Sequence, residues 1–338
     1  MKYPSVATRI AMTVLAPVFV ISLASEPAVA QPAAAGVKFA FQANADWIFY
    51  TGRKDKLFGE AGLKAELLQF ASGREMLAAL KGGDVDLATM SEVPFLIGVS
   101  QGLDLKVIYV AEDISHNHGL VVRKDSGINS LKDLKGKRIS YTRGSGANAS
   151  MAAALKYAGL TTKDVQLLDL LPSPAFIAFE KNEVQGVFVW QPWIERMVDA
   201  GGKVQAFDAD IKVATLNPWI ARTEWLVKNP DAARRVIAAA ELARKKLVKD
   251  PSAGIREVAS ELKISEEAAK RIYKRDILVS AEMQGDPSSR YSIVSANGVA
   301  KLIGAKAEIM KEAGILKSDM DSTKLVDSGP LKAYLRKK

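Results

Sequence analysis

The feature that most constrains the fold is a regular alternation of strand and helix patterns. Short apolar or alternating runs bounded by glycine, serine or proline predict strands, and amphipathic runs between them predict helices. The predicted strands are residues 37–42, 64–70, 85–90, 105–111, 118–123, 137–141, 166–171, 186–190, 203–207 and 219–222. This order is typical of α/β sheets, whose ligand-binding loops follow the strand ends. From Pro230 onward the pattern is almost wholly helical, over residues 232–249, 255–262, 266–274 and 292–313.

The first thirty residues predict a secretory signal peptide. Lys2 and Arg9 precede an apolar run over residues 10–24, and Ala28-Val29-Ala30 is a small-residue cleavage site. The run contains Pro17 and is too short for a retained membrane anchor. We therefore expect cleavage after Ala30. The sequence has no cysteine, hence no disulfide, and export of such a chain indicates the bacterial periplasm.

Composition limits the classes of function. The 338 residues suffice for two domains, and the 47 basic residues exceed the 38 acidic ones by nine without a long basic run. Scattered charge suits attraction of small anions better than nucleic-acid binding, so we expect no nucleic-acid partner. His116 and His118 are the only histidines. They are too few for a metal site, so we expect no metal and no cofactor, and assign His118 to hinge packing or a ligand hydrogen bond.

The segment from Thr142 to Gly146 predicts an anion site. It joins a strand to a helix of small residues, and a helix start offers unpaired N–H groups and the positive end of its dipole. Arg143 and Ser145 add a charge and a hydroxyl. A plain capped turn explains the segment equally well. It lacks the Gly-Lys-Ser/Thr of a Walker motif, and alanine replaces the last glycine of a dinucleotide fingerprint.

Three segments together carry a resemblance to a known family: SGREMLAALKGGDVDLATMSEVPFL, LKDLKGKRISYTRGSGANASMAAALKYAGL and FIAFEKNEVQGVFVWQPWIERM. In this order they resemble periplasmic solute-binding proteins of nitrate/taurine/sulfonate-type ABC importers, a family that includes binders of thiamine pyrimidine precursors. The resemblance implies a type II-like protein of two α/β lobes, each a mixed sheet flanked by helices, with the ligand cleft between them. Lobe 1 would comprise residues 37–117 and 220–338, and lobe 2 residues 118–219, with hinge strands at its ends. The implied partners are a small-molecule ligand and an ABC permease in the inner membrane, and we expect a monomer.

The same resemblance implies the residues that bind the ligand. They lie after predicted strands or at the starts of predicted helices: Asn44, Asp46, Trp47, Ser72, Gly73, Ser91, Glu92, Ser145, Gly146, Trp190 and Gln191. Asp46 would meet an ammonium group, as in taurine-binding members, although it could instead cap the helix beginning at Trp47. Glu92 could likewise only favour a helix start. Each tryptophan has core packing as its alternative role.

Two carboxylates near an anion site disfavour a bare anion such as nitrate. We therefore expect an organosulfonate such as taurine, whose anion meets backbone N–H groups and whose ammonium meets Asp46. If tryptophan side chains line the cleft, a thiamine pyrimidine precursor or another small aromatic solute is an alternative ligand. A periplasmic enzyme using Asp46 and Glu92 as an acid/base pair is the alternative of another class, but the sequence lacks recognised catalytic motifs, so we expect no catalytic residue.

Overall fold

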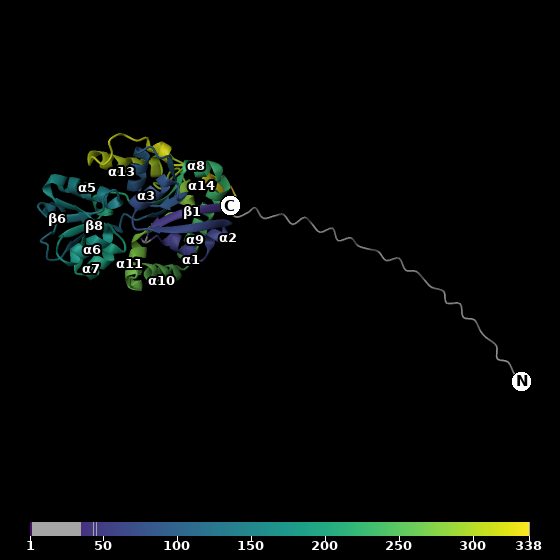
Figure 1. Cartoon of the computed structure of the whole chain (residues 1–338), viewed down its shortest axis with the longest axis horizontal. Coiled ribbons are helices and arrows are strands. Elements are labelled where there is room, and N and C mark those ends of the chain that lie inside the picture. Colours follow the sequence, from purple (N-terminus) through teal and green to yellow (C-terminus); the bar gives the residue numbers. More distant parts are fainter. Residues whose placement is uncertain (2–34, 43, 45, 338) are drawn as a thin grey trace. The chain divides into compact units, whose positions relative to one another are not determined.

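The structure is a computed structural model that describes Met1, residues 35–42, Asn44 and residues 46–337. The predicted signal peptide, its cleavage site after Ala30, and the loop residues Ala43 and Ala45 lie outside the described residues. Figure 1 shows a mixed α/β architecture built on two sheets flanked by helices, which confirms the predicted fold class.

The strands are β1 (Ala35–Gln42), β2 (Leu63–Phe70), β3 (Leu87–Thr89), β4 (Leu105–Asp113), β5 (His118–Arg123), β6 (Arg138–Tyr141), β7 (Gln166–Asp169), β8 (Gly186–Trp190), β9 (Gly202–Phe207), β10 (Leu216–Arg222) and β11 (Ile277–Leu278). The α-helices are α1 (Trp47–Lys54), α2 (Leu57–Glu60), α3 (Gly73–Gly82), α4 (Glu92–Ser100), α5 (Gly146–Ala158), α6 (Pro172–Glu180), α7 (Trp193–Asp199), α8 (Thr223–Lys228), α9 (Pro230–Lys249), α10 (Pro251–Leu262), α11 (Glu266–Arg275), α12 (Ala281–Gly285), α13 (Lys301–Glu312) and α14 (Gly329–Arg336). Short 3-10 turns are η1 (Leu131–Leu134), η2 (Thr162–Asp164), η3 (Asp208–Ile211) and η5 (Ser322–Leu325), and η4 (Ala296–Ala300) is a π-turn.

The first sheet has the strand order β11-β4-β10-β3-β1-β2. β1 is parallel to β2 and β3, whereas β10 is antiparallel to both β3 and β4. Its core is aromatic at the centre, where the Phe39 ring meets Phe49 and Trp219 edge-on at 5.4 and 4.9 Å between centroids. Such edge-to-face contacts add to the stability that burial provides.

The second sheet has the strand order β7-β6-β8-β5-β9. β6 is parallel to β7 and β8, and β5 is antiparallel to β8 and β9. β5 and β9 approach closely at Gly119, where an added Cβ would lie 2.2 Å from the Ala206 carbonyl oxygen. Only glycine fits there, at the irregularity in the β5–β9 register.

The chain passes between the sheets twice. It leaves the first sheet after β4 and enters the second at β5, then returns from β9 through η3 to β10. Each sheet has its own cluster of buried apolar residues, and Ile309 of α13 packs against both clusters. The lobe boundaries at residues 117/118 and 219/220 stay a prediction.

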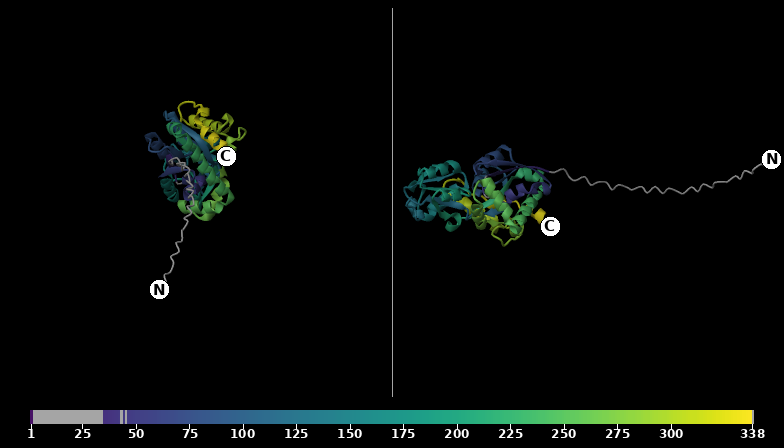
Figure 2. Two further views of the ribbon diagram at one scale, coloured as in Figure 1. Left: turned by 90° about the vertical axis from the view of Figure 1, so that its right-hand side faces the viewer. Right: turned by 90° about the horizontal axis from the view of Figure 1, so that it is seen from below.

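The C-terminal helices cover the first sheet. α9 buries a stripe that includes Ala233, Val236, Ile237 and Ala240, the spacing of one helix face, and Figures 1 and 2 show it beside the purple and blue elements of that sheet. Within the described part of the chain, every helix is too short or too polar to cross a bilayer.

The predicted helix over residues 292–313 is wrong at its start. The chain turns over residues 291–295, η4 is an irregular π-turn, and regular α-helix begins only with α13 at Lys301. Gly298 is the cause, since its backbone is non-helical and an added Cβ would lie 2.1 Å from the Ser292 carbonyl oxygen. The helix that begins at Trp47 ends at Lys54, and Lys56 has a positive φ of 56° before α2 begins at Leu57.

Candidate functional site

One cleft draws its lining from both sheets and their helices. Its lining residues are Gln42, Asn44, Gly73, Ser91, Ile114, Asn117, His118, Ser145, Gly146, Trp190, Gln191, Asn217 and Asp276. The cavity volume is about 40 Å³. A single water needs roughly 10–15 Å³ of such volume, so the cleft suits a compact solute.

Three helices begin at this cleft, and the N-cap or first residues that line it form what we call the helix-terminal group: Gly73, Ser91, Ser145 and Gly146. The N-cap residues of α3, α4 and α5 are Ser72, Ser91 and Ser145, and none of these side chains caps its own helix. No N-cap side chain therefore satisfies the first backbone N–H groups of these helices, although in α4 the Glu92 N–H donates to its own carboxylate. The three dipoles place positive potential there.

Glycine keeps the helix-terminal group open. A Cβ on Gly146 would lie 2.8 Å from His118 Nε2 and 3.1 Å from the Ser91 hydroxyl oxygen. These two polar atoms thus flank the start of α5, where only a hydrogen atom stands in place of a side chain. The space is suited to an anionic group that accepts hydrogen bonds from N–H and O–H donors.

A second set of cleft residues, the Asp276 group, consists of Asn117, Gln191 and Asp276. The half-buried Asp276 follows α11, and its carboxylate accepts hydrogen bonds from Trp47 Nε1 at 2.7 Å and Asn117 Nδ2 at 2.8 Å. Burial raises the pKa of Asp276 to about 7, although both hydrogen bonds favour the ionised form. A carboxylate has about four acceptor positions, so two remain for a ligand.

Asp46 and Trp47, two of the predicted ligand contacts, are absent from the cleft lining and contact other parts of the protein. Asp46 is fully buried, caps α1 by accepting from the Phe49 N–H at 2.9 Å, and accepts from the Thr89 hydroxyl at 2.7 Å. Burial raises the pKa of Asp46. Trp47 is also fully buried, with its ring edge-on to Tyr273. The alternatives of a cap and core packing hold for this pair.

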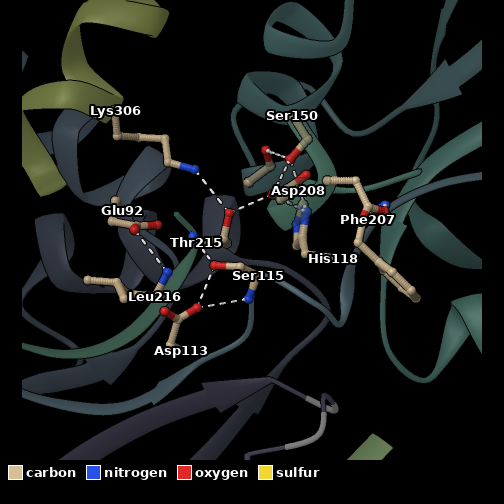
Figure 3. Close-up of polar contacts among 12 residues, drawn as sticks. Glu92, Asp113, Ser115, His118, Ser150, Phe207, Asp208, Thr215, Leu216 and Lys306 are labelled. Carbon is tan, nitrogen blue, oxygen red and sulfur yellow. Dashed lines mark hydrogen bonds and ion pairs between the residues drawn. The ribbon is translucent and has the colours of Figure 1, made fainter. Parts of the chain in front are cut away.

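Glu92, Ser72 and Arg143 are likewise absent from the cleft lining. Glu92 is buried, and its carboxylate accepts from the Leu216 N–H at 2.9 Å (Figure 3). Burial raises the pKa of Glu92. The Ser72 hydroxyl is buried without a partner among the described residues. Arg143 points outward, with a side chain 70% exposed and 3.5 Å from Asp169.

The structure brings the other eight predicted residues together at the cleft, namely Asn44, Gly73, Ser91, His118, Ser145, Gly146, Trp190 and Gln191. The sequence interpretation missed Gln42, Ile114, Asn117, Asn217 and Asp276. Asp276 follows a helix rich in charge and has no local signal, since Trp47 and Asn117 reach it from 229 and 159 residues away along the chain. Asn117 had a signal, because it lies between the two histidines.

The two histidines lie in different surroundings. His116 is exposed in the turn before β5, whereas His118 begins β5 and is buried. The His118 ring stacks on Trp190, with centroids 6.0 Å apart and planes 16° apart. Among the described residues no cluster of three or more metal-ligating side chains occurs.

Comparison with known proteins gives a family. A family model described as NMT1/THI5 like matches residues 46–253, more than half of the chain. The chain is 26% identical over 230 residues to the taurine-binding periplasmic protein of Escherichia coli, covering 67% of this chain and 71% of that protein.

Solved structures share the fold. The alkanesulfonate-binding protein of Xanthomonas axonopodis pv. citri bound to MOPS matches with a TM-score of 0.74 and 20% identity, covering 88% of this chain and 99% of that one. An enzyme shares it too, since a desulfurization enzyme matches with a TM-score of 0.62 and 14% identity over 90% of this chain and 99% of its own. The fold therefore does not separate binding from catalysis by itself.

Proposed function

The chain belongs to the NMT1/THI5-like family, and from this premise we propose that it is the periplasmic solute-binding component of an ABC importer. It captures a small organic zwitterion or anion and delivers it to a permease in the inner membrane. The observation that carries the proposal is the convergence of three uncapped helix starts on one cleft that also holds Asp276.

The anionic part of the ligand occupies the helix-terminal group. Backbone N–H groups from α3, α4 and α5 bind it, and the described cleft lining contains no lysine or arginine. His118 Nε2 and the Ser91 hydroxyl border the same space. A sulfonate suits this arrangement because its three oxygens can accept from several directions at once.

The cationic part of the ligand meets the Asp276 group. This assignment replaces Asp46 and Glu92 as the acids that meet an ammonium, because Asp276 alone among the three lines the cleft. Asn44 adds an acceptor, since its buried side-chain oxygen has no partner among the described residues. A nearby carboxylate disfavours nitrate and favours a zwitterion, and the taurine-binding relative points to the same class.

A thiamine pyrimidine precursor is less well supported. Of the two tryptophans proposed to cover an aromatic ligand, Trp47 is buried and Trp190 is stacked on His118. The compact cavity also favours a smaller solute. An enzyme built on Asp46 and Glu92 is not supported, because both side chains are buried and neither lines the cleft.

The test is a ligand screen on the purified protein. Taurine, ethanesulfonate, nitrate, a methylated aminopyrimidine and neutral amino acids are compared by thermal shift, followed by calorimetry of any ligand that raises the melting temperature. A ligand at roughly a hundred times its dissociation constant adds about 2.7 kcal/mol to the free energy of unfolding. We expect taurine to give the largest shift and to be recovered unchanged. A shift from the pyrimidine alone would refute the sulfonate assignment.

A further inference from the structure

His118 lies between the cleft and a buried polar network (Figure 3). Its Nδ1 lies 3.0 Å from the Ser150 hydroxyl oxygen and 3.2 Å from Asp208 Oδ2. Its Nε2 faces the opposite way, beside Gly146 at the cleft. The two nitrogens of one ring therefore have different surroundings. A proton on Nδ1 faces the buried network, whereas a proton on Nε2 faces the cleft.

The network has too few hydrogen atoms to give one to Nδ1. Lys306 Nζ donates a hydrogen bond to the Thr215 hydroxyl at 3.0 Å, so the hydroxyl is free to donate its own hydrogen bond to Asp208 Oδ2 at 2.5 Å. Ser150 has a single hydroxyl hydrogen, and its two other neighbours, Asp208 Oδ2 at 2.8 Å and the Gly146 carbonyl at 3.2 Å, are both acceptors of it. Nδ1 therefore faces only acceptors and must itself be protonated.

Asp208 is ionised in this network. Its burial opposes ionisation, but the attraction of His118 and Lys306 and the hydrogen bonds from His118 and Thr215 outweigh burial and hold its pKa below the ordinary value. The side chains around His118 also include Trp190 from β8 and Ser150 from α5, which are uncharged. Charges farther out are Lys306 on α13, Glu92 on α4 and Asp276 across the cleft.

We propose that Asp208 and Ser150 fix His118 as the Nδ1–H tautomer and thereby make it a proton-linked specificity residue of the cleft. The neutral ring offers a lone pair at Nε2, which repels an anion and accepts from a donor. The protonated ring offers an N–H, which an anion can accept. An anionic group at the helix-terminal group thus binds together with a proton. Asp208 is a positioning residue, because it acts only through His118.

This inference deepens the proposed function, in that it rests on an anion occupying the cleft. By linkage, binding of an anion together with one proton weakens as pH rises, by up to tenfold per pH unit. Ethanesulfonate is the probe of choice because it has no ammonium, so the titration of Asp276 does not act on it through an ammonium contact.

The first measurement reads the tautomer in the ligand-free protein. Only two histidines occur in the sequence, so labelling histidine with ¹⁵N gives two ring spin systems. His116→Gln, a change at the exposed histidine, assigns them. We expect His118 to be Nδ1–H when neutral, to remain so in Ser150→Ala, and to lose this preference in Asp208→Asn. An Nε2–H ring in the wild-type protein would overturn the proposal without any variant.

The second measurement is calorimetry with ethanesulfonate in two buffers of different ionisation enthalpy, above the pH at which the ring titrates. We expect uptake of close to one proton per ligand, abolished in His118→Gln and retained in His116→Gln. Tight binding with no proton uptake would overturn the proposal and leave the proposed function intact. Failure of every sulfonate to bind would contradict the proposed function, while the tautomer spectrum would still decide how Asp208 holds His118.

Discussion

In the proposed function, the helix-terminal group and the Asp276 group meet a ligand in the same cleft by different chemistry. The first consists of backbone N–H groups at three helix starts, which carry no net charge and cannot be removed by changing a side chain. The second depends on one carboxylate held by Trp47 and Asn117. The comparison teaches that the proposed anion site relies mainly on backbone groups that the fold supplies, with the Ser91 hydroxyl and the His118 ring beside them. The proposed recognition of a cation rests instead on Asp276.

The largest expected effect comes from filling the space at the helix-terminal group. Gly146→Ala places a Cβ 2.8 Å from His118 Nε2, where the anion would sit. We expect affinity for taurine and for ethanesulfonate to fall by roughly a hundredfold, about 2.8 kcal/mol, measured by calorimetry.

Gly59→Ala is the matched control, since nothing lies within 4 Å of its added Cβ. It should bind both ligands as the wild type does. Undiminished binding by Gly146→Ala, with a circular dichroism spectrum like that of the wild type, would mean that the anion sits elsewhere.

The next effect separates the two groups. Asp276→Asn removes the charge that meets the ammonium, and the loss of a hydrogen bond to a charged group is worth roughly 1.5–3 kcal/mol. We expect taurine to bind more weakly by this amount and ethanesulfonate, which lacks the ammonium, to bind as tightly as before. Equal losses of affinity for both ligands would show that Asp276 supports the structure of the cleft without binding the ammonium group. Asp46→Asn is the comparison variant, and we expect it to lower the melting temperature and leave the ligand preference unchanged.

A smaller effect concerns stability and pH. The pKa of Asp276 is about 7 in the folded protein, against roughly 3.9 in an unfolded chain. Between these values the folded state holds a proton that the unfolded state has released, so the free energy of unfolding falls as pH rises from about 4 to about 7. The Asp276→Asn variant has no such carboxyl group, so its free energy of unfolding does not fall for this reason. Its melting temperature relative to the wild type should therefore rise by a few degrees between pH 5 and pH 8, and a constant difference would contradict the raised pKa.

The smallest effect is expected at Arg143. Its side chain is 70% exposed and pairs with Asp169 at the surface, where ion pairs contribute little. Arg143→Ala should change the affinity for ethanesulfonate by less than about twofold at moderate ionic strength. A tenfold loss would restore the sequence-based assignment of this arginine to the anion site.

The sequence predicts most strands and the helix starts because these signals are local. The turn before α5 has Gly144 with a φ of 74°, a conformation that favours glycine, and its helix starts at the cleft as predicted. The same local signals could not separate a capping acid from a ligand-binding one. Asp46 precedes a helix in either role, and its partner Thr89 lies on another strand.

Contacts between distant segments could not be predicted, because the sequence signals are local. Asp276 becomes a cleft residue only because α11 brings it against Trp47 and Asn117. His118 was recognised as a candidate, but the acceptors around its Nδ1 come from α5 and η3, after the chain has folded back on itself. Chemistry assembled across such separations requires the tertiary structure.

The double passage of the chain between the sheets has a consequence for how a ligand is held. Gly73 and Ser91 open helices that follow first-sheet strands, while Ser145 and Gly146 lie between strands of the second sheet. The cleft is therefore two half-sites covalently tethered in one molecule. A solute that touches one half meets the other at an effective concentration set by the tether, as in a bivalent receptor. Two weak surfaces can in this way act as one strong site, and a fragment that reaches only one of them forfeits the gain.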